Sequence, residues 1–564
     1  MTQTMHAWET VIQYIESIGT DHIFGLPSDD LKVLTALQNS SVRFIIGRDQ
    51  RNCMFMASGY ALASNRLGVC IVGKGPALTN TLTGLLEAQH SGVPLLLIAL
   101  GTSSEKLGTK AFQEADQLTL VKPLVKWAYR IEHSSRLVWA LERAAFLAMN
   151  GSRGPVYLEL PEQIAEETVT VQHPFQQLVK LNCAPSTHEL EMAAALLREA
   201  RKPIIVVGGG MKSGTKGVIE PLAARLGAAI FATASGRTAI NESHPLFCGI
   251  AGLYTDPSIR TIWEEADTVL TLGSRLEETA TFEWDTLLEH TPLIQVNVSI
   301  EDFSHQYRGM KLLGDGDAAV QAWLSLLAQQ ADSSWLELIS HCKREAFRNR
   351  EACLHEIKGL PSVHVSEVLD TLQSQLTEPC ILVQENGLQD MWSYFYPFYQ
   401  FEDNSLSIVP SDQTSLGFGA AAAVGASLAD HRPVVALVGD GAFNLFQSDL
   451  ITAIQHHIPL IYIVMNNGGY GWLQYQLNQY DFEGRPFQFV TDAPLEHMNW
   501  SHHDFIEMIN IQEKSELESQ LTLALTRYRM NKLVIVMVKV ALEDVHEKIR
   551  NIYGDFPVFE NQIM

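Results

Sequence analysis

The chain has 564 residues, of which 46% are hydrophobic and 18% charged, a composition typical of folded globular proteins. Its formal net charge of −24 opposes binding to phosphate backbones, so we expect no nucleic-acid partner. The start of the chain shows no basic segment followed by an apolar run, and no apolar stretch reaches the roughly 20 residues of a membrane span. Seven scattered cysteines without metal-ligand spacing are typical of reduced thiols. We therefore expect a cytoplasmic protein with no membrane partner.

Short apolar runs alternate with amphipathic segments along the whole chain. Runs such as LGVCIVG (67–73), KPIIVVGGG (202–210) and PVVALVGDG (433–441) predict buried strands of parallel sheets. Segments between the runs, such as AWETVIQYIESIG (7–19), carry apolar residues at helical spacing. Repeated strand–helix alternation predicts an α/β fold of doubly wound parallel-sheet domains.

Two stretches predict domain boundaries. Residues near 165–187 lose periodicity, and residues near 330–362 form a charged helical stretch that ends in LPSV. We therefore expect three α/β domains at 1–165, 188–328 and 362–545, followed by a C-terminal tail at 546–564.

The most informative residues follow two predicted strands of the third domain. One strand leads into Gly439-Asp440-Gly441, and the next leads into Asn466-Asn467. Glycines let a ligand approach the backbone, and N–H groups at a helix N-terminus favour a diphosphate. Asp440 and Asn467 would lie at one sheet edge, where a carboxylate and an amide oxygen suit Mg²⁺. A GDG triplet alone is usually just a turn, whereas its conjunction with NN is more specific.

This spacing resembles the signature of thiamine diphosphate enzymes, and other segments extend the resemblance. Leu416 lies in a segment, TSLGFGAAAAVGA, that is similar to a family motif, as VQENGLQDMW is to a diphosphate loop. In the first domain, HIFGLPSDDL, GKGPALTN and GTKAFQEADQ resemble family segments, and KPIIVVGGG and EEADTVLTLGSRL do so in the central domain. The resemblance covers roughly residues 5–545 and is nearest to acetolactate synthases within the pyruvate decarboxylase superfamily.

The resemblance implies roles for individual residues in holding thiamine diphosphate. Asp440, Asn467 and the carbonyl of Gly469 would bind Mg²⁺, Leu416 would hold the cofactor bent, and Thr414 would face its aminopyrimidine. The further residues implied to bind the cofactor are Pro27, Gln50, Asn80, Asn386, Gly387, Gly439, Gly441 and Ala442.

The chain departs from the family at its activating glutamate. That residue precedes the Met of the MAxGYA helix by six positions, and here the position holds Gln50, ahead of MASGYA. The adjacent Asp49 is expected to point elsewhere. A carboxyl group at the pyrimidine N1′ exchanges a proton and favours the 4′-imino tautomer, whereas glutamine can only hydrogen-bond. Cofactor binding should survive, and activation of the cofactor should be slower.

Other departures concern the substrate. Trp472 and Gln476 take the places of a methionine and a tryptophan that shape the acceptor pocket of acetolactate synthases. Phe112 and Gln113 match substrate-facing positions. Asp29 matches an acid of pyruvate decarboxylases and would relay protons or bind a cationic group, although a helix N-cap is the equally weighted alternative. The segment after LGSRL lacks the family's charged run, so we do not infer FAD from the resemblance.

The residues therefore favour a thiamine diphosphate- and Mg²⁺-dependent carboligase or decarboxylase, in which Gln50, Asp29 and Gln113 are the candidate catalytic residues. Its small-molecule partners would be a 2-oxo acid donor and a carbonyl acceptor. The alternative is a catalytically weak cofactor-binding or regulatory homologue, which the loss of the glutamate suggests. Since the two halves of the cofactor site lie on separate domains, we expect a homodimer or a homotetramer.

Overall fold

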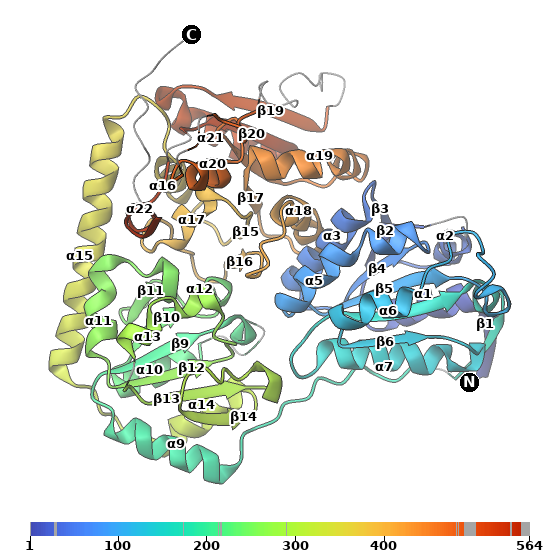
Figure 1. Ribbon diagram of the computed structural model, residues 1–564, viewed down its shortest axis with the longest axis horizontal. Helices are drawn as coiled ribbons and strands as arrows, with labels where there is room; N and C mark the ends of the chain where they lie inside the picture. Colours follow the sequence, from blue (N-terminus) through green and yellow to red (C-terminus); the bar gives the residue numbers. More distant parts are fainter. Residues whose placement is uncertain are drawn as a thin grey trace. The chain divides into compact units, whose positions relative to one another are not determined.

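The computed structural model describes residues 2–27, 31–172, 174–212, 214, 217–288, 290–480, 482, 484–489, 504–541 and 544–553. Contacts divide the chain into two compact units (Figure 1). Unit 1 consists of residues 1–181, 413–434 and 446–458, and unit 2 consists of residues 182–412, 435–445 and 459–564.

A six-stranded parallel sheet forms the centre of unit 1, with the strand order β3-β2-β4-β5-β7-β6. Its strands are β2 (His22–Leu26), β3 (Arg43–Ile46), β4 (Gly68–Val72), β5 (Leu95–Gly101), β6 (Trp127–Arg130) and β7 (Val156–Pro161). The helices of unit 1 are α1 (Ala7–Ser17), α2 (Lys32–Ala36), α3 (Gln50–Ser64), α4 (Pro76–Thr79), α5 (Leu82–His90), α6 (Gln117–Val121), α7 (Leu137–Met149), α8 (Glu162–Ala165) and α18 (Phe418–Ala429). Every residue of β4, β5 and β7 is buried, as the continuous apolar runs predict for central parallel strands.

A two-stranded antiparallel sheet supplements this core. Strand β1 (Thr2–His6) pairs with β8 (Thr168–Gln172), which lies in the stretch that we expected to be an irregular boundary. The difference arises because TVTVQ alternates polar threonine with apolar valine, a strand pattern too short to stand out without its partner.

Helix α18 packs against α3, although the two lie more than 350 residues apart in the chain. The helices approach so closely that a Cβ at Gly59 would collide with the carbonyl of Ala422, and one at Gly425 with that of Met56. Phe55 and Phe418 add an edge-to-face contact at 5.6 Å. The Gly/Ala-rich stretch is therefore a buried helix, and it supports the helix that Gln50 begins.

Unit 2 contains two further six-stranded sheets, and the strand pairings described in them are parallel. The central sheet, in the order β11-β10-β9-β12-β13-β14, consists of β9 (Pro203–Val207), β10 (Ala229–Ala232), β11 (Phe247–Ile250), β12 (Thr268–Leu272), β13 (Leu293–Asn297) and β14 (Met310–Leu313). The other sheet, in the order β16-β15-β17-β18-β20-β19, consists of β15 (Ile381–Gln384), β16 (Leu406–Ile408), β17 (Val434–Gly439), β18 (Ile461–Asn466), β19 (Ile506–Ile511) and β20 (Leu533–Lys539). With the sheet of unit 1, the fold therefore has three parallel-sheet α/β domains, as the sequence predicts.

Helices accompany both sheets of unit 2 (Figure 1). They are α9 (Thr187–Glu199), α10 (Ile219–Leu226), α11 (Arg260–Glu265), α12 (Glu278–Thr281), α13 (Trp284–Leu287), α14 (Gly316–Leu326), α15 (Ser333–Lys358), α16 (Val365–Gln375), α17 (Leu388–Tyr394), α20 (Gly471–Leu477), α21 (Leu517–Arg529) and α22 (Glu547–Tyr553). Helix α19 (Asp440–Gln455) begins in unit 2 and ends in unit 1. The long helix α15 accounts for the charged helical stretch predicted near 330–362.

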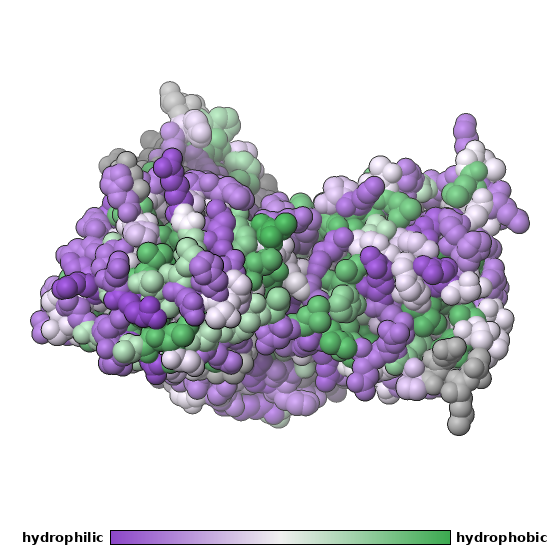
Figure 2. Space-filling model, turned by 90° about the horizontal axis from the view of Figure 1, so that it is seen from below, coloured by the Kyte–Doolittle hydropathy of each residue, from purple (hydrophilic) through white to green (hydrophobic). Residues whose placement is uncertain are grey.

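On the face that Figure 2 shows, hydrophobic residues are interspersed among hydrophilic ones. Within the described part of the chain, no helix is both long and apolar enough to cross a membrane.

Candidate cofactor site

The carboxylate of Asp440 lies at the junction between β17 and α19 in unit 2. Its side chain is buried, with the residue 2% exposed, and its oxygens accept hydrogen bonds from the backbone N–H groups of Gly441 and Gly468, each at 3.0 Å. Strands β17 and β18 are parallel neighbours, with Gly439 opposite Met465. The structure thus brings the GDG turn and the NN turn together at the carboxyl edge of one sheet.

Burial raises the pKa of Asp440 to about 7, although nearby backbone N–H groups act to lower it. A buried carboxylate of this kind is relieved by a cation beside it. The other oxygens of the turn are the Asn467 amide, which accepts from the Gly469 N–H at 3.2 Å, and the Gly469 carbonyl. This all-oxygen set fits a hard cation such as Mg²⁺. Among the described residues no cluster of three His, Cys, Asp or Glu side chains exists.

Glycines make the turn possible. A Cβ at Gly441 would lie 2.7 Å from the Tyr470 ring, one at Gly469 would collide with the Phe487 carbonyl, and Gly468 has a φ of +73°. The loop is also tied down, because Phe489 N–H donates to the Gly468 carbonyl at 2.6 Å. Main-chain groups therefore approach this edge closely and with little freedom.

The remaining predicted residues of unit 2 flank the same sheet. Asn386 and Gly387 follow β15, and the Asn386 N–H donates to the Glu385 carboxylate at 3.1 Å. Ala442 is buried in the first turn of α19. Trp472 and Gln476 lie one turn apart on α20, where Trp472 is half-buried and stacks on Tyr475, and Gln476 is exposed.

Gln50 is the first residue of α3 in unit 1, and Asp49 caps that helix by accepting from the Arg51 N–H at 2.8 Å. Asn80 follows α4, and its amide nitrogen donates to Gln50 Oε1 at 2.8 Å and to Asp49 Oδ1 at 3.2 Å. The structure therefore brings together two predicted site residues, Gln50 and Asn80. It also joins Asp49 to them, whereas we expected Asp49 to point elsewhere.

Other predicted residues of unit 1 lie in loops. Pro27 is half-buried after β2, and Asp29 lies outside the described residues. Gln113 has a φ of +56° and lies against Gly75, and its neighbour Phe112 is 70% exposed. An exposed phenylalanine of this kind is available to contact another molecule.

Thr414 and Leu416 precede α18 and belong to unit 1. Thr414 is exposed and has a φ of +45°, and Leu416 is half-buried. Between them, the Ser415 N–H donates to the buried Glu87 carboxylate at 3.0 Å. This contact holds the segment against α5.

Sequence reasoning missed Asp449, which fixes the start of α3. Asp449 is fully buried, and its two oxygens accept from the Arg48 N–H and from the Asn52 amide, each at 2.8 Å. The signal that could have revealed it is an acid whose neighbours at helical spacing, Leu445, Phe446 and Ala453, are apolar, since buried acids need partners.

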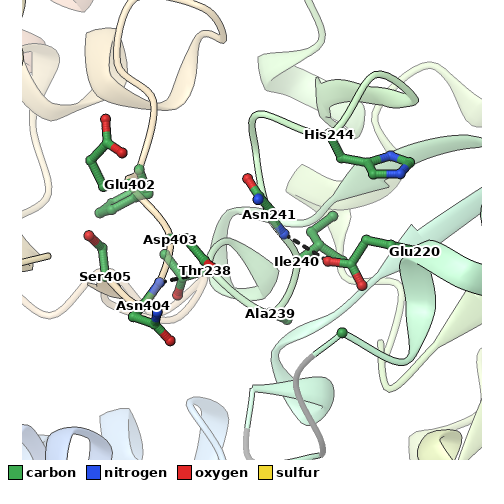
Figure 3. A pocket seen from close by; sticks show the side chains of 12 residues that line it. Glu220, Thr238, Ala239, Ile240, Asn241, His244, Glu402, Asp403, Asn404 and Ser405 are labelled. Atoms are coloured by element: carbon green, nitrogen blue, oxygen red, sulfur yellow. Dashed lines mark hydrogen bonds between the residues drawn. The ribbon is translucent and has the colours of Figure 1, made fainter.

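A cavity of about 460 Å³ forms a separate feature of unit 2 (Figure 3). Residues 401–405 line one side of it, and the other side includes Glu220, whose carboxylate accepts from the Asn241 N–H at 3.0 Å. None of the predicted site residues that the structure describes lines this cavity.

Comparison with protein families assigns the class of protein. Residues 5–120 match the N-terminal binding domain of thiamine pyrophosphate enzymes, residues 190–323 the central domain, and residues 386–538 the C-terminal binding domain. These matches follow the order of the three sheets and together span most of the chain. The chain belongs to the thiamine pyrophosphate enzymes.

Within that class the chain is acetolactate synthase-like. It is 27% identical over 500 residues to the acetolactate synthase large subunit of Lactococcus lactis, covering 86% of this chain and 84% of the relative. The large subunit of Haemophilus influenzae is 26% identical over 542 residues, covering 94% of each chain. Isozyme 3 of Escherichia coli is 25% identical over 553 residues, also covering 94% of each.

Proposed function

We propose that the protein is a thiamine diphosphate- and Mg²⁺-dependent carboligase or decarboxylase of a 2-oxo acid. The observation that carries the proposal is the buried Asp440 carboxylate, held by the Gly441 and Gly468 N–H groups beside Asn467 and Gly469. When bound, thiamine diphosphate would supply a carbon nucleophile for the 2-oxo group and an acceptor for the electron pair that CO₂ leaves behind.

The residues of unit 2 would bind the charged end of the cofactor. Asp440, Asn467 and the Gly469 carbonyl would hold Mg²⁺, and the backbone at Gly439, Gly441 and Ala442 would accept the diphosphate. Asn386 and Gly387 would add N–H donors. Trp472 and Gln476 would border the acceptor, and their bulk and polarity favour an acceptor other than a second pyruvate.

The residues of unit 1 would bind the pyrimidine end. Gln50 would hydrogen-bond N1′, Thr414 would accept from the 4′-amine, and Leu416 would keep the cofactor bent. Pro27, Asn80, Gln113 and Asp29 would line the reaction face. Since each unit carries half of the residues, we propose a homodimer or a homotetramer as the working assembly.

The alternative function is a cofactor-binding homologue with little catalysis. It is favoured by Gln50, since an amide cannot exchange a proton with N1′ at neutral pH. The intact oxygen set around Asp440 favours the enzyme instead.

The test is turnover of a panel of 2-oxo acids by purified protein with thiamine diphosphate and Mg²⁺, with and without aldehyde acceptors. CO₂ release and product mass are measured, and Asp440→Ala serves as the inactive control. We expect an aldehyde or acyloin product that Asp440→Ala abolishes. Tight cofactor binding without turnover of any acid would favour the non-catalytic alternative.

A further inference from the structure

Three polar side chains meet at the start of α3 in unit 1, and their contacts determine how the Gln50 amide is oriented. Asn80 Nδ2 lies 2.8 Å from Gln50 Oε1 and 3.2 Å from Asp49 Oδ1. The same Asp49 oxygen accepts the Arg51 backbone N–H at 2.8 Å. The Arg51 guanidinium lies 3.9 Å from the other Asp49 oxygen.

The donors and acceptors of these side chains are compatible with only one orientation of the Asn80 and Gln50 amides. An ionised carboxylate has no hydrogen to donate, so Asp49 can only accept. Asn80 must therefore turn its NH₂ end toward Asp49, and the same NH₂ end faces Gln50. The atom of Gln50 that receives this donor has to be the carbonyl oxygen, because two amide NH₂ groups cannot bond each other. The Gln50 oxygen therefore faces Asn80, and the Gln50 NH₂ group faces away from Asn80.

We propose that Asp49 and Asn80 lock the Gln50 amide so that it presents an N–H donor, and not an acceptor, to N1′ of the aminopyrimidine. This inference rests on the proposed function, in which Gln50 contacts that nitrogen. In this role Asp49 and Asn80 are positioning residues, since they act on N1′ through Gln50, and any direct contact of Asn80 with the cofactor is separate from it.

The direction of the donor has a chemical consequence. In the 4′-amino tautomer N1′ is an acceptor, so a donor from Gln50 forms a hydrogen bond with it. In the 4′-imino tautomer N1′ carries a hydrogen, so the same donor would face another donor. A hydrogen bond gained in one form and lost in the other shifts the ratio of the two forms by about tenfold. The cluster thus holds the bound cofactor in the amino form, the opposite of what a carboxyl group at this position would favour.

Exchanging the side chains at positions 49 and 80 should reverse the orientation of the Gln50 amide. In the double variant Asp49→Asn/Asn80→Asp the acceptor-only group stands at position 80, so Gln50 turns its NH₂ end inward and its oxygen toward N1′. The net charge is unchanged, and asparagine is as good an N-cap as aspartate. Asn80→Ala provides a second variant, because it removes the lock and leaves the cap of α3 in place.

The experiment measures the tautomer of bound thiamine diphosphate by circular dichroism of the Mg²⁺-loaded protein. It also measures the Kd of an analogue in which N1′ is replaced by C–H. We expect the amino form in the wild type and an imino-to-amino ratio about a hundredfold higher in the exchanged variant, which reverses a roughly tenfold preference. Asn80→Ala should give an intermediate ratio. Replacing N1′ should weaken binding about tenfold in the wild type and less in Asn80→Ala.

Gln50→Glu calibrates the imino signal, and thermal melting shows which variants are folded. If the exchanged variant is unfolded, the decision rests on Asn80→Ala and on the analogue. Equal tautomer ratios in the wild type and in the folded variants would overturn the lock, as would an unchanged Kd for the analogue. Failure of the wild type to bind thiamine diphosphate in an Asp440-dependent way would instead overturn the proposed function.

Discussion

The Asp440 turn of unit 2 and the Gln50 cluster of unit 1 hold their polar groups in different ways. Asp440 is buried and is bonded by main-chain N–H groups of Gly441 and Gly468, which cannot change without refolding the turn. Gln50 is held by Asn80, a more exposed side chain whose amide can be reoriented by its neighbours. The comparison teaches that main-chain hydrogen bonds fix the position of the Asp440 carboxylate, whereas side-chain hydrogen bonds leave the orientation of the Gln50 amide open to change by substitution.

The largest effect is expected at Asp440. Asp440→Ala removes the only carboxylate of the oxygen set, so Mg²⁺-dependent binding of thiamine diphosphate should weaken by at least about a hundredfold. Isothermal titration calorimetry checks this. Asp430→Ala, which removes a carboxylate paired with Arg432, is the matched control and should bind normally. Normal binding by Asp440→Ala would break the comparison.

Gln50→Glu tests the Gln50 cluster of unit 1, where we expect a change in the reactivity of the cofactor and little change in its binding. Binding of thiamine diphosphate should change by less than about threefold, because either side chain can hydrogen-bond N1′. The rate at which the cofactor's C2 hydrogen exchanges with solvent deuterium, measured by NMR after acid quench, should rise at least about tenfold. A loss of binding with no gain in exchange would show that Gln50 serves binding rather than reactivity.

Low pH should lower the stability of unit 2 through a buried histidine, His546, a kind of residue that the Gln50 cluster does not contain. Burial, and next the charges of Lys548, Arg550 and His364, lower the pKa of His546 from 6.5 to about 3. The unfolded chain takes up a proton below about pH 6.5 that folded His546 does not. This contribution to stability is therefore complete above that pH and falls by up to about 1.4 kcal/mol per pH unit toward pH 3.

The measurement is urea unfolding of the wild type and of His546→Phe between about pH 7 and pH 5. His546 stacks on Phe395 at 3.6 Å, so phenylalanine keeps the ring contact. The difference between the two unfolding free energies isolates His546 from other titrating groups. Stability curves that stay parallel would contradict the prediction.

The smallest effect is expected at Gly469. Gly469→Ala places a Cβ against the Phe487 carbonyl, so the loop has to shift, and cofactor binding should weaken about fivefold. Gly359→Ala is the matched control, because that residue has a helical φ of −78° and its nearest neighbour for a Cβ is the Glu356 carbonyl at 3.3 Å. Equal Kd values for both variants would show that the turn is less constrained than its contacts indicate.

The sequence by itself determined the fold class, the family and the two turns at Asp440 and Asn467. Continuous apolar runs such as PVVALVG specify central parallel strands, and consecutive parallel strands end at the same edge, so residues that follow them meet. Local pattern was enough because each of these features depends on a strand and the few residues after it.

Tertiary structure alone decided contacts between segments that are distant in the chain. The pairing of β1 with β8, the close packing of α18 on α3 and the partners of Asp449 all depend on which segments fold together. The orientation of the Gln50 amide also depends on contacts between segments that are distant in the chain. Its sequence position shows that an amide stands there, but Asn80 and Asp49 determine which end of the amide faces outward, because hydrogen-bond direction depends on all three groups at once.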